Sequence, residues 1–260
     1  MHNLKLGFKM YSDEIGKYDK EVFDFFNHDL FSYIELFMNP NTMENLEAWK
    51  NFKAKIKVPF TLHAPHSVFN VNLANKDQFE FNKEIFNKQV DKYAEELDVQ
   101  YVVVHPGKLG TIEETVRQLN LIKPKRMSIE NKPIISRKTM ERTYRGAIPD
   151  EIKYVRDNYN CGFCLDISHC MSTANELGKN PYEFLKEFQK LNPTSYHISG
   201  NKLDSLIDLH IHFSKCDWDL HKVFEIIDTS KNITVETRKD KEACFKEYEE
   251  DLKTLQEATE

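Results

Sequence analysis

The stretch CGFCLDISHC, residues 161–170, is an apolar run that ends at a carboxylate, Asp166, with an imidazole, His169, just beyond it. The residues before Asp166 have the continuous apolar character of a parallel strand that is buried on both faces. One strand that ends in a carboxylate carries little weight by itself. The fold and the function therefore depend on whether the other apolar runs of the chain end in the same way.

Seven further short apolar runs are separated by charged stretches. With residues 161–166, they cover 4–9, 32–37, 58–63, 99–105, 126–130, 194–199 and 232–236. Between them, residues 76–97, 180–191 and 240–258 have the apolar stripe of amphipathic helices. Asn180 before Pro181 predicts a capped helix start. Eight strands alternating with helices in 260 residues predict the α/β fold class, as a single-domain (β/α)8 TIM barrel.

A doubly wound open sheet is the alternative fold. That fold usually has a glycine-rich phosphate loop after its first strand, and GFKMYSDEIG, residues 7–16, matches such a loop poorly.

The charge balance favours a water-soluble protein and gives no general attraction for nucleic acid or an anionic membrane. The formal net charge is −6, with 42 acidic and 36 basic residues. This total does not exclude a local basic groove. No apolar stretch approaches the roughly 20 residues that span a bilayer. The first 14 residues lack the apolar core of a signal peptide. We therefore expect a cytoplasmic protein that does not bind membranes.

The five cysteines do not form a disulfide framework, because their number is odd and no regular spacing repeats. Cys161 and Cys164 form a C-x-x-C, which raises a redox or structural zinc role. Both lie inside an expected strand rather than at a helix start, so reduced thiols are the simpler interpretation.

Side chains that can bind metal stand at the carboxyl ends of six of the eight runs. These are His63, His105, Glu130, Asp166, His197 and Glu236, and His169, Asp208 and His210 follow shortly after strand ends. The carboxyl ends of barrel strands meet at one mouth, where the active sites of this fold lie. Nine such groups in one cavity would leave buried charges unpaired unless cations neutralise them. The donors suit Zn²⁺, with Mn²⁺ or Fe²⁺ as alternatives, and suffice for two or three ions.

The order of these motifs resembles the endonuclease IV family of xylose isomerase-like barrels. The matching motifs are HAP (63–65), NLA (72–74), HPG (105–107), IEN (129–131), LDISH (165–169), YHIS (196–199), DLH (208–210) and VET (235–237). The resemblance spans the third to the eighth strand. It implies a zinc-dependent hydrolase that cleaves phosphodiesters at abasic sites in DNA, a DNA repair function.

The resemblance also implies three zinc ions. His63, His105 and Glu130 would hold the first ion, and Glu130 would bridge to a second, completed by Asp166, His197 and Glu236. His169, Asp208 and His210 would hold the third.

The sequence departs from the family at positions that concern the substrate. Leu209 replaces the arginine of the family's DRH motif, and residues 38–49 lack the basic residue expected to enter the DNA groove. His66 stands where a tyrosine is common, and Lys9 ends a GFK where the family has GxH. DNA and a smaller phosphorylated molecule therefore both stay candidate substrates.

Glu35, in YIELF, supports a second hypothesis, a sugar isomerase or epimerase of the same superfamily. Such enzymes hold one ion with a set that Glu130, Asp166, His197 and Glu236 would supply. Glu130 and Glu236 would then be the catalytic acid and base, with Glu35 as a further candidate. The simpler interpretation of Glu35 is an ion pair with Lys9 on the neighbouring strand.

A third hypothesis is an inactive barrel with a structural metal, which the full set of nine donors disfavours. Three other side chains receive roles from their positions alone. His212 is a candidate for binding substrate phosphate, His221 is expected on the surface of a helix over residues 217–230, and Trp218 is expected to anchor helix packing.

Overall fold

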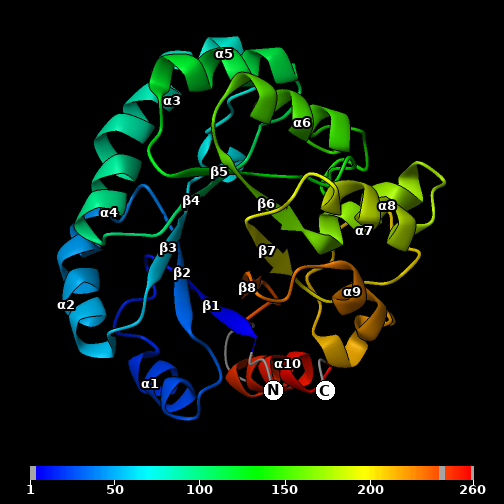
Figure 1. The fold of residues 1–260 in the computed structure, drawn as a ribbon. Coiled ribbons are helices and arrows are strands. Elements are labelled where there is room, and N and C mark those ends of the chain that lie inside the picture. The colour runs from blue at the N-terminus through cyan, green and yellow to red at the C-terminus, as the bar shows by residue number, and fades with distance from the viewer. Residues whose placement is uncertain (1–3, 240–243, 259–260) are drawn as a thin grey trace.

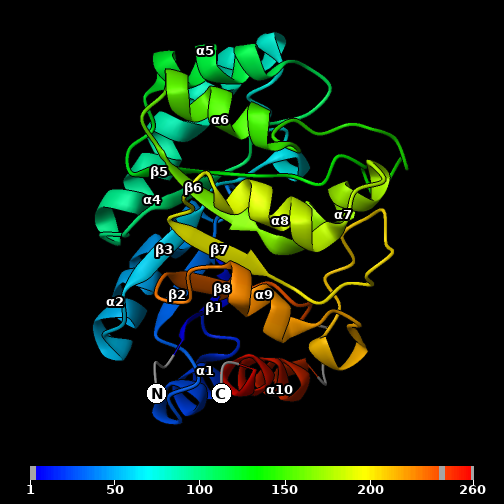
Figure 2. The same ribbon diagram turned by 45° about the vertical axis from the view of Figure 1, so that its right-hand side comes forward.

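The protein folds as a closed barrel of eight parallel strands, in a computed structural model that describes residues 4–239 and 244–258. Each strand pairs with the next in sequence, and β8 pairs back with β1. The strands are β1 (Lys5–Tyr11), β2 (Tyr33–Phe37), β3 (Phe60–His63), β4 (Val102–Val104), β5 (Met127–Glu130), β6 (Gly162–Asp166), β7 (Ser195–Ile198) and β8 (Asn232–Val235). Helices surround this sheet (Figures 1 and 2). The predicted (β/α)8 barrel is therefore confirmed, and the open sheet is wrong.

The helices follow the strands in the expected alternation. They are α1 (Asp19–Asn27), α2 (Leu46–Ile56), α3 (Phe79–Ile85), α4 (Asp91–Glu96), α5 (Ile112–Ile122), α6 (Pro149–Asn158), α7 (Ile167–Glu176), α8 (Pro181–Gln189), α9 (Leu220–Ile226) and α10 (Cys244–Glu257). A π-helical segment, η4 (Phe86–Val90), joins α3 to α4, so the expected helix at 76–97 is continuous. Residues 240–243, the expected start of the last helix, lie outside the described residues.

Two boundaries differ from the sequence-based expectation. The run at 99–105 contributes only Val102–Val104 to β4, so His105 stands just beyond its strand. The helix expected at 217–230 is shorter, because Asp219 caps its start by accepting a hydrogen bond from the Lys222 N–H and Ile227 is extended.

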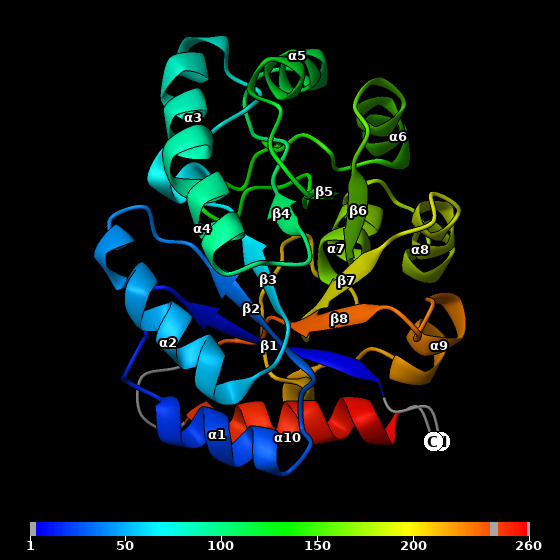
Figure 3. The same ribbon diagram turned by 60° about the vertical axis from the view of Figure 1, so that its left-hand side comes forward.

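Aromatic side chains hold the last helix against the first strand and thereby help to close the ring. The Phe8 ring lies 4.9 Å from that of Tyr248 and 5.9 Å from that of Phe25, measured between centroids. Phe245 packs on the same rings. Helix α10 accordingly lies beside α1 (Figure 3). Such ring pairs add directional packing to the area they bury.

The inside of the barrel contains a polar layer beneath the mouth. Tyr33 reaches into it, and its hydroxyl lies 2.8 Å from that of Thr234. A Cβ at Gly7 would stand 2.3 Å from the Tyr33 ring, so the glycine makes room for this side chain. The layer also contains Glu35, which is fully buried. A carboxylate is thus held directly under the predicted metal donors.

The four described thiols have the properties of packing residues. Cys161, Cys164, Cys170 and Cys216 are free, and burial raises the pKa of both Cys161 and Cys164 to about 11. Neutral, buried thiols favour a packing role for the C-x-x-C. Among residues 4–239 and 244–258, no helix is long and apolar enough to cross a membrane.

The start of α8 offers a test of the local structure. The Asn180 side-chain oxygen accepts hydrogen bonds from the N–H groups of Tyr182 and Glu183, at 3.1 and 3.2 Å. Because Asn180 is exposed, Asn180→Ala should remove only this cap and lower the free energy of unfolding by about 1 kcal/mol. Denaturant unfolding checks this. Asn180→Ser retains a capping oxygen and should lose far less; equal losses in both variants would contradict the capping role.

Candidate metal centre

The nine predicted donors converge at the carboxyl ends of the strands, around a cavity of about 700 Å³. Seven of them line the cavity, and Asp166 and His197 are buried beside them. Their donor atoms form four groups within 4.8 Å. These are His63, Glu130 and His197; His169, Asp208 and His210; Glu35, His197 and Glu236; and Glu130, Asp166 and His169. The structure therefore brings predicted donors together, and Glu130, His169 and His197 each belong to two of these groups.

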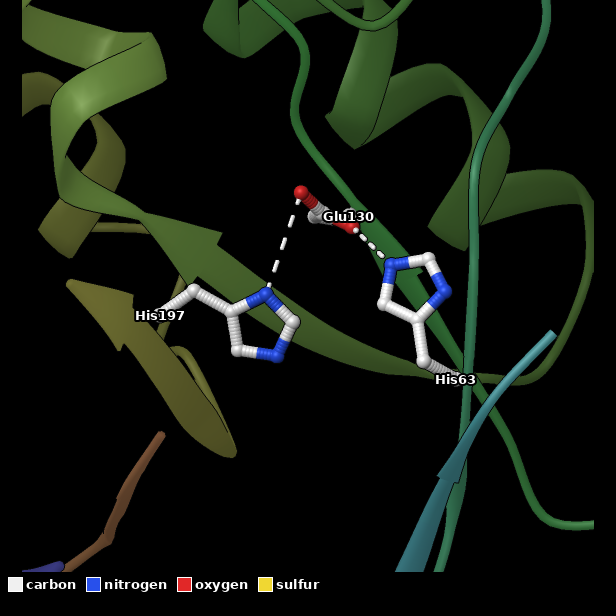
Figure 4. A group of neighbouring side chains, drawn as sticks. All are labelled: His63, Glu130 and His197. Atoms are coloured by element: carbon white, nitrogen blue, oxygen red, sulfur yellow. Dashed lines mark hydrogen bonds and ion pairs between the residues drawn. The ribbon is translucent and has the colours of Figure 1, made fainter. Parts of the chain in front are cut away.

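Glu130 is the centre of what we call the first set, together with His63 and His105. Its Oε2 lies 3.2 Å from His63 Nε2 and 2.8 Å from His105 Nε2. Its Oε1 lies 3.9 Å from His197 Nδ1, so the carboxylate stands between imidazoles of β3 and β7 (Figure 4). Donor pairs around a tetrahedral zinc ion are about 3.3 Å apart, given bonds of about 2.0 Å. The distances from Glu130 Oε2 to His63 Nε2 and His105 Nε2 are close to this spacing.

The second set consists of Glu130, Asp166, His197 and Glu236. His197 Nδ1 lies 2.9 Å from Glu236 Oε1 but outside hydrogen-bonding geometry. Within the described chain, neither His197 Nδ1 nor Asp166 Oδ2 has a hydrogen-bond partner, although both atoms are buried. Buried polar atoms without partners are rare and call for an explanation, of which an ion is one. These two atoms are thus suited to bind a cation.

The third set consists of His169, Asp208 and His210. Asp208 Oδ2 lies 3.2 Å from His169 Nε2 and also contacts His210 Nε2. His210 has a backbone φ of 49°, which is uncommon for a residue other than glycine. The Arg238 N–H donates to the His210 carbonyl and helps to hold this conformation. Backbone strain of this kind clusters at functional sites.

The local sequence explains why Asp166 and His169 act together. Asp166 ends β6 and is also the N-cap of α7, where its Oδ1 accepts a hydrogen bond from the His169 N–H at 2.8 Å. Three residues after the cap, His169 lies in the first turn of the helix, next to its own cap. The other carboxylate oxygen, Oδ2, is left without a hydrogen bond.

Backbone carbonyls fix which nitrogen of three imidazoles faces the centre. The Nδ1–H groups of His63, His169 and His210 donate to the carbonyls of Ala64, Asn131 and Glu236, at 2.9, 2.9 and 2.8 Å. Because a carbonyl can only accept, each ring carries its proton on Nδ1. The lone pair on Nε2 is then the one that can bind a metal ion. Metal-binding histidines are oriented in this way by their other nitrogen.

Glu35 orients the His197 ring, as backbone carbonyls orient the other three. Its Oε2 lies 3.0 Å from His197 Nε2, which leaves Nδ1 for an ion. Its Oε1 lies 3.1 Å from Lys9 Nζ, so the ion pair expected as the simpler interpretation is present. Burial alone would raise the pKa of Glu35, but His197 and Lys9 lower it to about 2. Since Glu35 does not line the cavity, this placement supports a positioning role rather than a catalytic one.

The electrostatics of the third set favour bound cations. Burial disfavours charge on its imidazoles, but Asp166 raises the pKa of His169 to about 10, and Asp208 raises that of His210 to about 9. Without an ion, both rings thus hold a proton near neutral pH. A divalent ion would replace these protons and supply the same compensation. The donor chemistry, spacing and unpartnered atoms together fit divalent metal.

Sequence analysis gave no role to two residues beside the donors. The Asn131 side chain donates to the Asp166 carbonyl at 2.9 Å and accepts from the Asp166 N–H at 2.7 Å, which links β5 to β6. Lys132 places its Nζ 3.2 Å from His105 Nε2. Both residues directly follow Glu130 at the end of β5, and this position in the sequence could have predicted that they lie at the mouth of the barrel. Lys9 contacts Glu236 as well as Glu35.

The proposed role of His212 in binding substrate phosphate is wrong in this structure. His212 is buried outside the described cavity lining, with its Nδ1 2.6 Å from Asp251 Oδ2. Its position after the DLH motif suggested the site, but its side chain is paired with α10 instead. His221 is exposed on α9, and Trp218 is packed into the core, as expected.

Comparison with known proteins places the chain in a family. The model of the family described as "xylose isomerase-like TIM barrel" matches residues 27–258. The chain belongs to this family. No curated protein matches the sequence.

Solved structures share the fold over nearly the whole chain. Endonuclease IV from Thermus thermophilus is 19% identical, with a TM-score of 0.71 over 98% of both chains. A putative xylose isomerase from Rhodospirillum rubrum is 10% identical, with a TM-score of 0.72 over 98% of this chain and 99% of that one. D-Psicose 3-epimerase from Clostridium cellulolyticum is 13% identical, with a TM-score of 0.61 over 97% and 96%. At these identities the likeness establishes the fold alone.

The positioning role of Glu35 can be tested by its effect on metal affinity. Glu35→Gln keeps the size of the side chain but removes the charge that orients His197. Zn²⁺ affinity, measured by competition with a chromophoric chelator, should fall about 10- to 100-fold.

Asp251→Asn is the matched control, because Asp251 pairs with a buried histidine outside the cavity. It should lower stability but leave Zn²⁺ affinity unchanged. Equal affinity changes in both variants would contradict the role of Glu35.

Proposed function

We propose that the protein is a hydrolase of phosphate esters that uses a multinuclear zinc centre of up to three ions. The observation that carries this proposal is the third set, His169, Asp208 and His210, beside donors that would already hold one ion. An isomerase with one ion needs only the second set. Hydrolysis of a phosphodiester benefits from further cations, because charge builds up on both attacking and leaving oxygens.

The cavity suits an anionic substrate of limited size. A volume of about 700 Å³ is typical of small-molecule sites and could hold one nucleotide unit or a phosphorylated sugar. Apart from the donors, its described lining includes one acid, Asp13, and five cations. These are Lys9, Lys132, Arg137, Arg238 and Lys239. The exposed Arg137 and Arg238 make no ion pair with any described residue, so they support phosphate binding despite the net charge of −6.

The chain's own residues would bind and orient the substrate in this mechanism. When bound, zinc supplies charge neutralisation and lowers the pKa of the attacking water. Glu130 belongs to both the first and the second set and would keep their donors at fixed distances. Hydrogen bonds to backbone carbonyls orient His169 and His210, so that their Nε2 atoms face the centre. Phosphate is drawn to the guanidinium groups at the cavity, where bidentate contacts are available. An abasic site in DNA and a smaller phosphoester are both candidate substrates.

A metal-dependent sugar isomerase or epimerase is the second candidate. The unpartnered Asp166 Oδ2 and His197 Nδ1 both belong to the second set, which would suffice for one ion. Glu130 and Glu236 would flank a bound sugar as acid and base. Against this, Lys9 contacts Glu236 and two histidines contact Glu130, and these contacts disfavour the transfer of a proton by either carboxylate.

Activity assays on one substrate panel separate the two candidates. The Zn²⁺-loaded protein should cleave an abasic-site duplex or a small phosphodiester. His210→Ala should lower that rate about 100-fold or more, because it removes a donor of the third set. His221→Ala, an exposed histidine on α9, is the control and should keep full activity.

The same panel includes ketohexoses in D₂O, followed by NMR. No deuterium should enter the sugar. Deuterium uptake that survives His210→Ala, without any phosphoester cleavage, would contradict the hydrolase and support the isomerase.

A further inference from the structure

The ammonium group of Lys132 lies between the first and the third set. Its Nζ is 3.2 Å from His105 Nε2, 3.3 Å from His169 Nε2 and 3.5 Å from Glu130 Oε1. The residue is only 7% exposed. Its backbone N–H donates to the Gly146 carbonyl, which fixes the segment after β5. The Lys132 ammonium group therefore stands between donors of the predicted metal centre.

We infer that Lys132 takes the place of one divalent ion, so that the centre holds two ions and not three. The inference deepens the proposed function by fixing the number of ions. It rests on the metal centre and not on the reaction proposed for it.

The first argument is geometric. The ring nitrogens that Lys132 contacts are the ones that an ion would need, because His169 donates its Nδ1–H to the Asn131 carbonyl. An ion bound to either nitrogen would stand where the Lys132 ammonium now contacts that nitrogen. With bonds of about 2.1 Å, ions in both the first and the third set would lie within about 5.4 Å of Nζ. Buried like charges at such distances repel strongly.

The second argument is the balance of charge. The donors include four carboxylates, Glu130, Asp166, Asp208 and Glu236, while Glu35 is paired with Lys9. Two divalent ions neutralise four carboxylates, and Lys132 then leaves one positive charge for one anionic group of a substrate. Three ions would leave three positive charges in a buried site, which is costly without further anions.

The contacts of Lys132 also indicate which sites are filled. Asp166 Oδ2 and His197 Nδ1, both in the second set, make no hydrogen bond with Lys132 or any other described residue. The second set therefore keeps its ion. The first and the third set, each of which loses a nitrogen to Lys132, share the other ion.

The test compares zinc content per chain in the wild type and in Lys132→Met, after saturation with Zn²⁺ and dialysis. Elemental mass spectrometry gives the number of ions, and isothermal titration gives it independently. We expect two ions in the wild type and three in Lys132→Met. Lys239→Met, which removes another cavity-lining lysine that pairs with Glu14, should keep two. Lys132→Arg, which retains the charge, should also keep two.

Three ions in the wild type would overturn the inference, as would equal numbers in the wild type and Lys132→Met. The wild-type count remains decisive if Lys132→Met fails to fold, which thermal unfolding would reveal. Two ions without phosphoester cleavage would support the ion count and contradict only the proposed reaction.

Discussion

The constraint on which the rest of the structure depends is the burial of five carboxylates at one end of a parallel barrel. Glu35, Glu130, Asp166 and Asp208 are buried close to one another, and the side chain of Glu236 beside them is 9% exposed. Such a cluster is stable only if cations compensate it. Lys9 and Lys132 supply part of that charge, and we propose that metal ions at the unpartnered donors of the second set supply the rest. The hydrogen bond from Nδ1–H of His210 to the Glu236 carbonyl leaves its Nε2 to face these carboxylates. The positive backbone φ of His210 helps to place the ring there.

The fold and the donors could be predicted from sequence because the barrel gives a simple rule. Parallel strands in chain order bring their carboxyl ends to one mouth, so a residue such as His63 or Glu130 at a strand end is placed without any knowledge of packing. What could not be predicted is which atom contacts which. Glu35 was expected to be either catalytic or paired with Lys9, and it pairs with Lys9 while also orienting His197. The direction taken by the long Lys132 side chain depends on tertiary contacts that no periodicity encodes. The prediction for His212 was wrong for the same reason, since its partner Asp251 lies on a helix distant in sequence.

The family membership leaves the chemistry open, because structures of this fold include endonuclease IV as well as a sugar epimerase. Function is decided by the site that a fold carries. In this chain the third set favours hydrolysis, and the cations around the cavity favour a phosphorylated substrate. The same cations show that a net charge of −6 does not describe the local field at the mouth.

A crystal structure of protein purified without chelators, with anomalous data collected on both sides of the zinc absorption edge, tests the central claim most directly. The account predicts an anomalous peak about 2.0–2.2 Å from both His197 Nδ1 and Asp166 Oδ2, because these buried donor atoms have no hydrogen-bond partner in the described chain. Density without an anomalous peak there, in zinc-supplemented crystals, would contradict a metal centre. Hydrogen bonds from water or protein to these two atoms would then be the explanation for their burial.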